Sequence, residues 1–191
     1  WRHDMDNSLQ AFTRLKGYLY VDENDVLRDK CRDHTYLENL IQEGERILWE
    51  YNEADRIKIC GILGNLYRIK GDTEIALPYL ERYKEYSIKY ENDETATLAL
   101  LRYAEGLKCA REYNEALAIF EEVLERCQLL NIEKYENIGW QQLGKCYLEM
   151  GDLKQAENCF LKALLLRRKI NDPKLLEASK SVLNFMMKIK K

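Results

Sequence analysis

The chain has 191 residues, of which 46% are hydrophobic and 33% charged, with only 2 Pro and 9 Gly. This composition suits a soluble helical protein and leaves little room for a β-rich fold, and the sequence includes no apolar run near the ~20 residues of a membrane span. The formal net charge of −3 argues against nucleic acid as a partner of the whole chain.

The first third of the chain predicts two helices. Apolar residues recur at helical spacing near the start: Leu9, Phe12, Leu15 and Leu19. We expect an amphipathic helix over about 6–20, an acidic loop over 21–29 and a long helix over about 29–51. Residues 1–53 are therefore interpreted as an N-terminal helical pair, either a degenerate repeat or a cap over the apolar face that follows.

The next segment, 54–93, predicts a pair of helices. The first runs from about Ala54 to Lys70, and Gly71 ends it as a residue suited to a left-handed helix terminus. The second starts at Asp72 or Thr73, which are good N-cap residues, and continues to about Tyr90. Because Pro78 lies inside this helix and lacks a backbone donor, we expect a mild kink or a late helix start there.

Two more pairs follow at the same spacing. Segment 94–133 predicts helices over about 94–110 and 114–130, and segment 134–172 predicts a third pair around a break at Gly151-Asp152. Asn171-Asp172-Pro173 then combines a cap with a proline at the first helical position, which is a strong helix-start signal. Residues 173–191 are interpreted as a C-terminal capping helix.

The third pair has a recognisable pattern, W-x2-L-G-x2-Y, a turn, and A-x3-F-x2-A. Its seven places are Trp140, Leu143, Gly144, Tyr147, Ala156, Phe160 and Ala163. The pattern recurs at steps of 40 residues without insertion, so that Gly144 corresponds to Ala104 and Gly64. Small residues at such places let two helices cross closely.

This pattern resembles the tetratricopeptide repeat (TPR), whose usual period is about 34 residues. The longer unit is similar to those of kinesin light chains and of bacterial receptors for signalling peptides. The resemblance implies a right-handed α-solenoid of TPR helix hairpins with N- and C-terminal capping helices, forming a single domain over 1–191. It also implies a binding scaffold, without naming the partner.

We find no residue pattern that predicts catalysis. The two histidines, His3 and His34, stand in no metal-binding or catalytic motif, and the sequence has no glycine-rich phosphate loop and no G-x-S-x-G. The six cysteines form no C-x-x-C pair and are interpreted as buried thiols in a reducing compartment. We therefore expect a cytoplasmic protein that is not an enzyme and has no metal and no cofactor.

In TPR arrays the first helix of each pair lines the concave groove, so its non-core side chains are candidate ligand contacts. These candidates are Lys58, Asn65, Arg68, Arg102, Glu105, Lys108, Gln141, Gln142 and Lys145, with Ser181 and Lys188 from the last helix. Amide and guanidinium donors suit an extended peptide, whose carbonyl and carboxylate oxygens need partners.

The best single candidate is Asn65, because it takes the place where chaperone-binding TPRs hold a peptide carboxylate. The rest of that clamp differs, since Gly61 and Arg102 replace its lysine and its next asparagine. The sequence therefore does not predict a receptor for chaperone tails.

The leading hypothesis is a protein-protein interaction scaffold that binds an extended peptide or a partner helix in the concave groove. One alternative is the peptide-sensing regulatory domain of a larger transcriptional or signalling protein. Because the chain begins at Trp1 rather than Met, this alternative carries the expectation of a targeting segment or a further domain upstream.

A further alternative is nucleic-acid or anionic-partner binding through the basic C-terminal end. Residues 162–191 carry 9 Lys/Arg against 2 Asp/Glu, whereas residues 1–56 carry 8 against 13. The other interpretation of this end is a solvated terminal helix with cations near its C-terminus. We expect a protein or peptide partner, no membrane, and a monomer or a dimer through stacked end helices.

Overall fold

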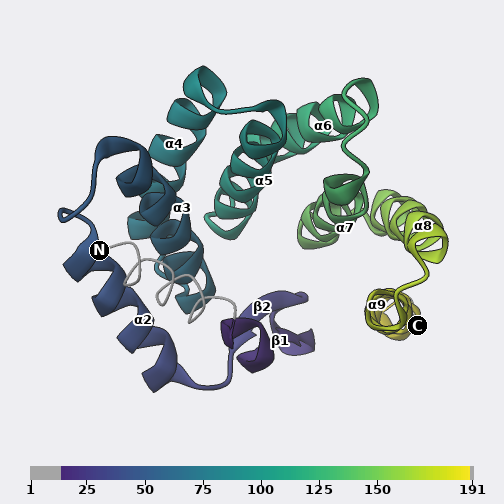
Figure 1. Ribbon diagram of the computed structural model, residues 1–191. Coiled ribbons are helices and arrows are strands. Elements are labelled where there is room, and N and C mark those ends of the chain that lie inside the picture. Colours follow the sequence, from purple (N-terminus) through teal and green to yellow (C-terminus); the bar gives the residue numbers. More distant parts are fainter. Residues whose placement is uncertain (1–13, 190–191) are drawn as a thin grey trace.

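The computed structural model describes residues 14–189, and these form a curved stack of helices with one small β-hairpin (Figure 1). The helices are α2 (His34–Ile47), α3 (Glu53–Lys70), α4 (Thr73–Tyr90), α5 (Asp93–Cys109), α6 (Tyr113–Leu129), α7 (Glu133–Glu149), α8 (Leu153–Ile170) and α9 (Pro173–Ile189). The all-α solenoid predicted from the 40-residue step is confirmed.

The helices follow one another around an arc (Figure 1). Each packs mainly against its neighbours in the chain, so that α3 contacts α4, α4 contacts α5, and the order continues to α8 with α9. Helices α3, α5 and α7 also contact each other in sequence along the inside of the arc, while α4, α6 and α8 lie outside them (Figure 1). The inside of the arc is therefore built from the first helix of each pair, followed by α9.

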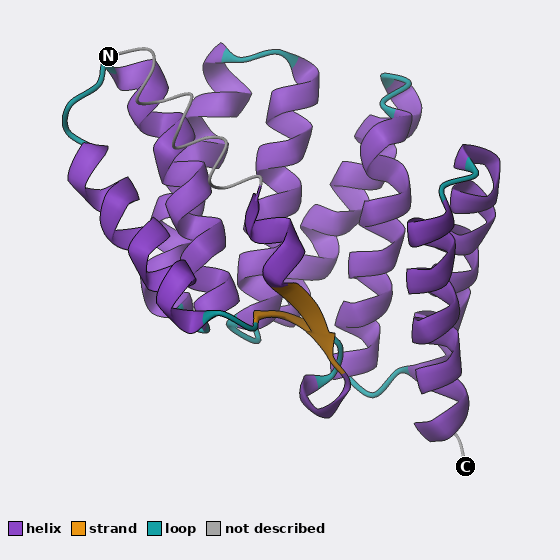
Figure 2. Cartoon of the chain, turned by 60° about the horizontal axis from the view of Figure 1, so that its bottom comes forward, coloured by secondary structure: helices purple, strands orange, loops and turns teal. Residues whose placement is uncertain are grey.

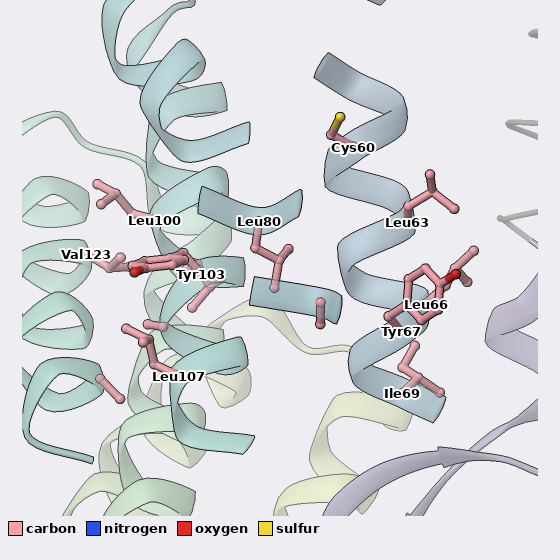
Figure 3. Close-up of a cluster of buried hydrophobic side chains, with 14 of the residues drawn as sticks. Cys60, Leu63, Leu66, Tyr67, Ile69, Leu80, Leu100, Tyr103, Leu107 and Val123 are labelled. Carbon is pink, nitrogen blue, oxygen red and sulfur yellow. The ribbon is translucent and has the colours of Figure 1, made fainter. Parts of the chain in front are cut away.

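Close helix crossings explain the small residues of the repeat. A Cβ atom on Gly64 would lie 2.6 Å from Cγ of Leu80, and one on Gly144 would lie 2.6 Å from Cε1 of Phe160. Both distances are shorter than any carbon–carbon contact that packing allows, so these places need glycine or a shift of the partner. The large partners fill the space between the helices, as Figure 3 shows for Leu80.

Local caps set most helix ends. The side chains of Asn52, Asn92 and Asp152 accept hydrogen bonds from backbone N–H groups in the first turns of α3, α5 and α8. Gly71 ends α3 with a φ of 100°. Helix α4 begins at Thr73 and continues through Pro78, so of the two alternatives expected there, a mild kink or a late start, the late start is wrong.

Residues 16–31 differ from the expectation. An antiparallel hairpin replaces the end of the first predicted helix, the predicted loop over 21–29 and the predicted helix start at Asp29. The N-terminal half of the first predicted helix, 6–20, lies outside the described residues. A short 3-10 turn (Lys16–Tyr18) leads into β1 (Leu19–Asp22), a second one (Glu23–Asp25) forms the bend, and β2 (Arg28–Cys31) returns.

The turn chemistry of the hairpin explains the bend. Asp22 caps the second 3-10 turn by accepting a hydrogen bond from the backbone N–H of Asn24. Val26 and Leu27 then adopt left-handed conformations with φ of 48° and 62°. Such conformations are unfavourable for side chains of this kind, and an isolated two-stranded hairpin is marginal in water. The hairpin is therefore held by the helices around it.

Candidate functional site

The β-hairpin lies inside the arc of helices, on the concave side (Figure 1), and crosses in front of the central helices when the bottom of the molecule is turned forward (Figure 2). Leu27, at its bend, is 2% exposed and belongs to an apolar cluster with Leu148, Val182 and Met186. The concave face of this molecule thus already holds an extended segment of its own chain.

Helix α7 holds the hairpin by two ion pairs one helical turn apart. Nη2 of Arg28 donates to Oε2 of Glu149 at 2.6 Å, and its Nε donates to Oε1 at 3.3 Å. Nζ of Lys145 donates to Oδ1 of Asp29 at 3.2 Å. The side chains of Lys145 and Glu149 are 1% and 3% exposed, so both pairs act in a largely dry environment.

The neighbouring helices extend this network. Arg68 of α3 lies 3.6 Å from Oδ2 of Asp29 and 3.4 Å from Oε2 of Glu105 on α5. Lys108 of α5 donates to Oε1 of Gln142 on α7 at 3.1 Å. Glu105 corresponds to Lys145 and Lys108 to Arg68 at the 40-residue step, so equivalent places of successive helices meet at one point.

The charges in the network determine the ionisation of Asp29. Burial by itself raises the pKa of this carboxyl group, but the facing cations Lys145, Arg68 and Lys108 outweigh burial and lower the pKa to about 2. Asp29 is therefore held as a carboxylate at neutral pH. The ion pair between Arg28 and Glu149 raises the pKa of the Arg28 guanidinium.

Three cavities flank the hairpin. The largest, of about 400 Å³, has Arg28 and Asp29 of the hairpin in its wall, together with Arg68 and Cys109. A second, of about 330 Å³, lies between the hairpin and helices α7 and α9, where Arg32, Leu27, Gln141 and Ser181 contribute to its wall. The third, of about 170 Å³, is lined by Leu15, Lys16, Leu19, Ile62, Asn65, Leu66 and Arg102. Oε1 of Gln141 is buried and finds no hydrogen-bond partner within residues 14–189.

The structure separates the candidate residues into three groups. Five of them meet in the buried network: Arg68, Glu105, Lys108, Gln142 and Lys145. Others line the flanking cavities: Asn65, Arg102, Gln141 and Ser181. The remaining two are held by ion pairs at the surface, Lys58 with Asp55 and Lys188 with Glu23 of the hairpin.

Three residues of the network were not among the candidates: Arg28, Asp29 and Glu149. The sequence did contain a signal for the hairpin, since Asp22, Asn24 and Asp25 favour a turn and stand between the short apolar segments 19–21 and 26–27. Glu149 could have been noticed because it corresponds to Cys109 and Ile69 at the 40-residue step. A carboxylate at a place that is otherwise apolar needs a partner.

The basic C-terminal end is partly used within the fold. Arg167 is buried and donates to Oδ1 of Asn137 and to Oγ of Ser179, both at 3.0 Å, which ties α8 to α7 and α9. Nζ of Lys162 lies 3.8 Å from the ring centre of Trp140. Lys190 and Lys191 lie outside the described residues.

We found no cluster of His, Cys, Asp and Glu that could hold a metal ion among residues 14–189. Five cysteines are buried, Cys109 is half-buried, and burial raises the pKa of the Cys146 thiol to about 12. In the same part of the chain, no helix is both long enough and apolar enough to span a membrane.

Sequence comparison finds one family. Residues 57–87 and 94–169 match family profiles described as tetratricopeptide repeat, and the two matches together span more than half of the chain. Among curated proteins, none has a matching sequence.

Comparison with solved structures finds the same type of repeat. The apo form of RapI superposes with a TM-score of 0.66 at 19% identity, over 83% of this chain and 58% of RapI. A Rap protein complexed with Competence and Sporulation Factor superposes with a TM-score of 0.70 at 18% identity, over 82% of this chain and 46% of that one. A kinesin light chain-type protein of Podosopora anserina with nearly identical TPR-like repeats has a TM-score of 0.65 at 13% identity, over 97% and 87%.

These likenesses concern the fold. The chain spans little more than half of RapI and less than half of the second Rap protein.

Proposed function

The chain belongs to the tetratricopeptide repeat family, an interaction scaffold, and on that premise we propose that it binds an extended peptide segment of a partner protein. The binding face is the concave side formed by α3, α5, α7 and α9. Recognition of extended segments by main-chain and side-chain contacts along a groove is a common mode of peptide binding.

One observation supports this proposal above the others. Charged side chains of α3 and α7 pair with the extended strand β2, Arg68 and Lys145 with Asp29 and Glu149 with Arg28, so this face has the chemistry to hold a strand. A face that holds a segment of its own chain by ion pairs is suited to a segment of another chain.

The cavities beside the hairpin provide room for such a segment. The one of about 330 Å³ combines apolar walls, among them Val21 and Val182, with Arg32, Ser181 and the carbonyl oxygen of Gln141, which has no hydrogen-bond partner among residues 14–189. A peptide N–H placed against that oxygen would satisfy it, and the guanidinium of Arg32 could receive a carbonyl or carboxylate oxygen.

A second candidate function is peptide sensing within a larger regulatory protein. It is favoured by the Rap protein that was solved with Competence and Sporulation Factor and that is about twice as long as the matched region. The complete reading frame tests it, since an additional domain upstream of Trp1 is expected. A start codon directly before Trp1 would exclude this candidate and leave the scaffold proposal unaffected.

The peptide-binding proposal is tested by selecting random 12-residue peptides, displayed on phage, against the full chain. Each selected peptide is then titrated by calorimetry into the wild-type protein and into the variants Arg102→Glu and Asn65→Asp. The second variant keeps an acceptor for Arg68, which donates to Oδ1 of Asn65 at 2.8 Å, but adds a negative charge. We expect at least tenfold weaker binding by both variants.

Lys154→Glu is the matched control, because this exposed lysine lies on the outer helix α8. The Lys154→Glu variant should bind the selected peptides with the same affinity as the wild type. Selection of no peptide, or affinities unchanged by Arg102→Glu and Asn65→Asp, would show that the concave face is not the binding face. Circular dichroism confirms that each variant is folded.

A further inference from the structure

The contacts of the hairpin define the chemistry of a binding site on α7 and α3. Along α7, a cation at Lys145 and an anion at Glu149 stand one helical turn apart. The hairpin presents Asp29 to the first and Arg28 to the second, so adjacent residues of one strand satisfy both charges. This is a two-charge match between a helix and an extended chain.

Of the two charges that the hairpin brings, the groove depends more on the acidic one. Without the hairpin, Lys145 would have no carboxylate within 4.0 Å among the described residues, since Asp29 is the group that pairs with it. Glu149 would keep the hydroxyl of Tyr113 at 3.2 Å and Lys108 at 4.0 Å. Since an unpaired charge at a buried site is costly, a segment that replaced the hairpin would have to bring an acidic group to Lys145.

The hairpin itself is weakly built. Its two residues with left-handed backbone, Val26 and Leu27, stand at the bend, and the two strands pair over four residues only. Because such an element is marginal in isolation, its position depends on the groove: on the ion pairs, on buried Leu27 and on the surface pair between Glu23 and Lys188. An element held in this way can be exchanged for a competing segment.

We propose that Lys145, Arg68 and Glu149 form a binding site for an extended peptide that carries a basic residue followed directly by an acidic one, and that the hairpin is its resident occupant. A partner peptide with this pair of charges competes with Arg28-Asp29 for the site. The inference rests on the proposed function, because it assigns the ligand chemistry of the same concave face.

The test uses a fluorescently labelled peptide with the sequence of residues 19–31, in which Cys31 is replaced by Ser. Its binding to the full chain is followed by fluorescence anisotropy. In the variant Arg28→Glu/Asp29→Lys the resident hairpin is repelled by the groove, so we expect this protein to bind the peptide at least tenfold more tightly than the wild type. Lys30→Ala is the matched control, because Lys30 pairs with Asp22 and Asp25 of the hairpin itself, and it should bind like the wild type.

A charge exchange in the groove makes the test specific. Addition of Lys145→Glu and Glu149→Lys to the Arg28→Glu/Asp29→Lys variant should abolish binding of the native peptide. In the same protein the exchanged charges of the hairpin should again pair with those of α7, so that its melting temperature recovers toward that of the wild type.

Two outcomes overturn the proposal. One is that the Arg28→Glu/Asp29→Lys variant is folded by circular dichroism but binds the peptide no better than the wild type, which would make the hairpin a fixed part of the fold. The other concerns the milder variant Asp29→Asn, which is used if the double variant does not fold. We expect it to bind the peptide at least threefold more tightly than the wild type, and equal binding refutes the site.

Failure here is distinguishable from failure of the proposed function. Suppose that the phage-selected peptides require Arg102 but do not carry the basic-acidic pair and do not displace the labelled hairpin peptide. This result would support groove binding and refute this site. Absence of any selected peptide would refute the proposed function itself.

Discussion

At the scale of single residues, the turn inside the second repeat shows strain that its counterparts avoid. The turns after α3 and α7 use Gly71 and Gly151 with φ of 100° and 85°. At the equivalent place after α5, Arg111 adopts a φ of 67°. A residue with a Cβ atom pays about 1 kcal/mol or more for this left-handed conformation, and glycine does not.

The variant Arg111→Gly should therefore be more stable than the wild type by about 1 kcal/mol, because the native backbone would no longer be strained. Urea unfolding followed by circular dichroism measures the difference. Gly151→Ala is the matched control and should be less stable than the wild type by about 1 kcal/mol. Nothing lies within 4 Å of the added Cβ, so the left-handed backbone is the only source of the destabilisation. Equal stabilities of the three proteins would contradict this explanation of the turns.

At the scale of elements, the hairpin depends on the ionisation of Asp29. The folded pKa of about 2 lies below the value of about 3.9 for an unfolded chain. A group with a lowered folded pKa contributes stability that is fully present above the unfolded value and is lost as the pH falls through the folded one. The stability that ionised Asp29 contributes is therefore lost between about pH 5 and about pH 1.

We expect Asp29→Asn to be less stable than the wild type by up to about 2 kcal/mol at pH 7, with a difference that narrows as the pH is lowered from 5 toward 2. Urea unfolding at a series of pH values measures both curves. Glu85→Gln on the exposed face of α4 controls for the loss of one negative charge. A difference that stayed constant with pH would show that the cations do not act on Asp29.

At the scale of the whole molecule, the hairpin adds connections that a solenoid lacks. In repeat proteins each unit contacts its neighbours, so stability is transmitted locally along the stack. Here Asp29 joins α3 to α7 through Arg68 and Lys145, and Lys188 joins α9 to the hairpin. Units that are distant in the stack are thus coupled through the inside of the arc.

Breaking this connection should affect one end of the stack more than the other. In Glu149→Ala we expect amide hydrogen exchange in α7, α8 and α9 to become at least tenfold faster, because Arg28 loses its partner on α7, while exchange in α4 stays nearly unchanged. Exchange read out by mass spectrometry on proteolytic fragments measures this. Glu43→Ala, which removes an exposed pair with Arg46, is the control and should change neither end. A uniform acceleration would mean that the hairpin does not couple the units.

The repeats were predictable from the sequence because their determinants are local. Spacing of Gly64, Ala104 and Gly144 sets where helices cross, and caps such as Asn52 set where they begin, so the helices from α3 to α9 follow from neighbouring residues. Family and fold could therefore be inferred from the pattern. Which candidate residues face a ligand remains a prediction.

What only the tertiary structure decided is the occupancy of the groove. Arg28 and Glu149 are 121 positions apart, and Asp29 and Lys145 are 116 apart, so no local pattern connects them. The short strands of the hairpin are marginal by themselves and form where the curved stack offers complementary charges and a buried place for Leu27. The sequence by itself determined the repeating helices, because a helix depends on residues three and four positions apart. The arc those helices build decided the position of the hairpin, because charges pair through space and not along the chain.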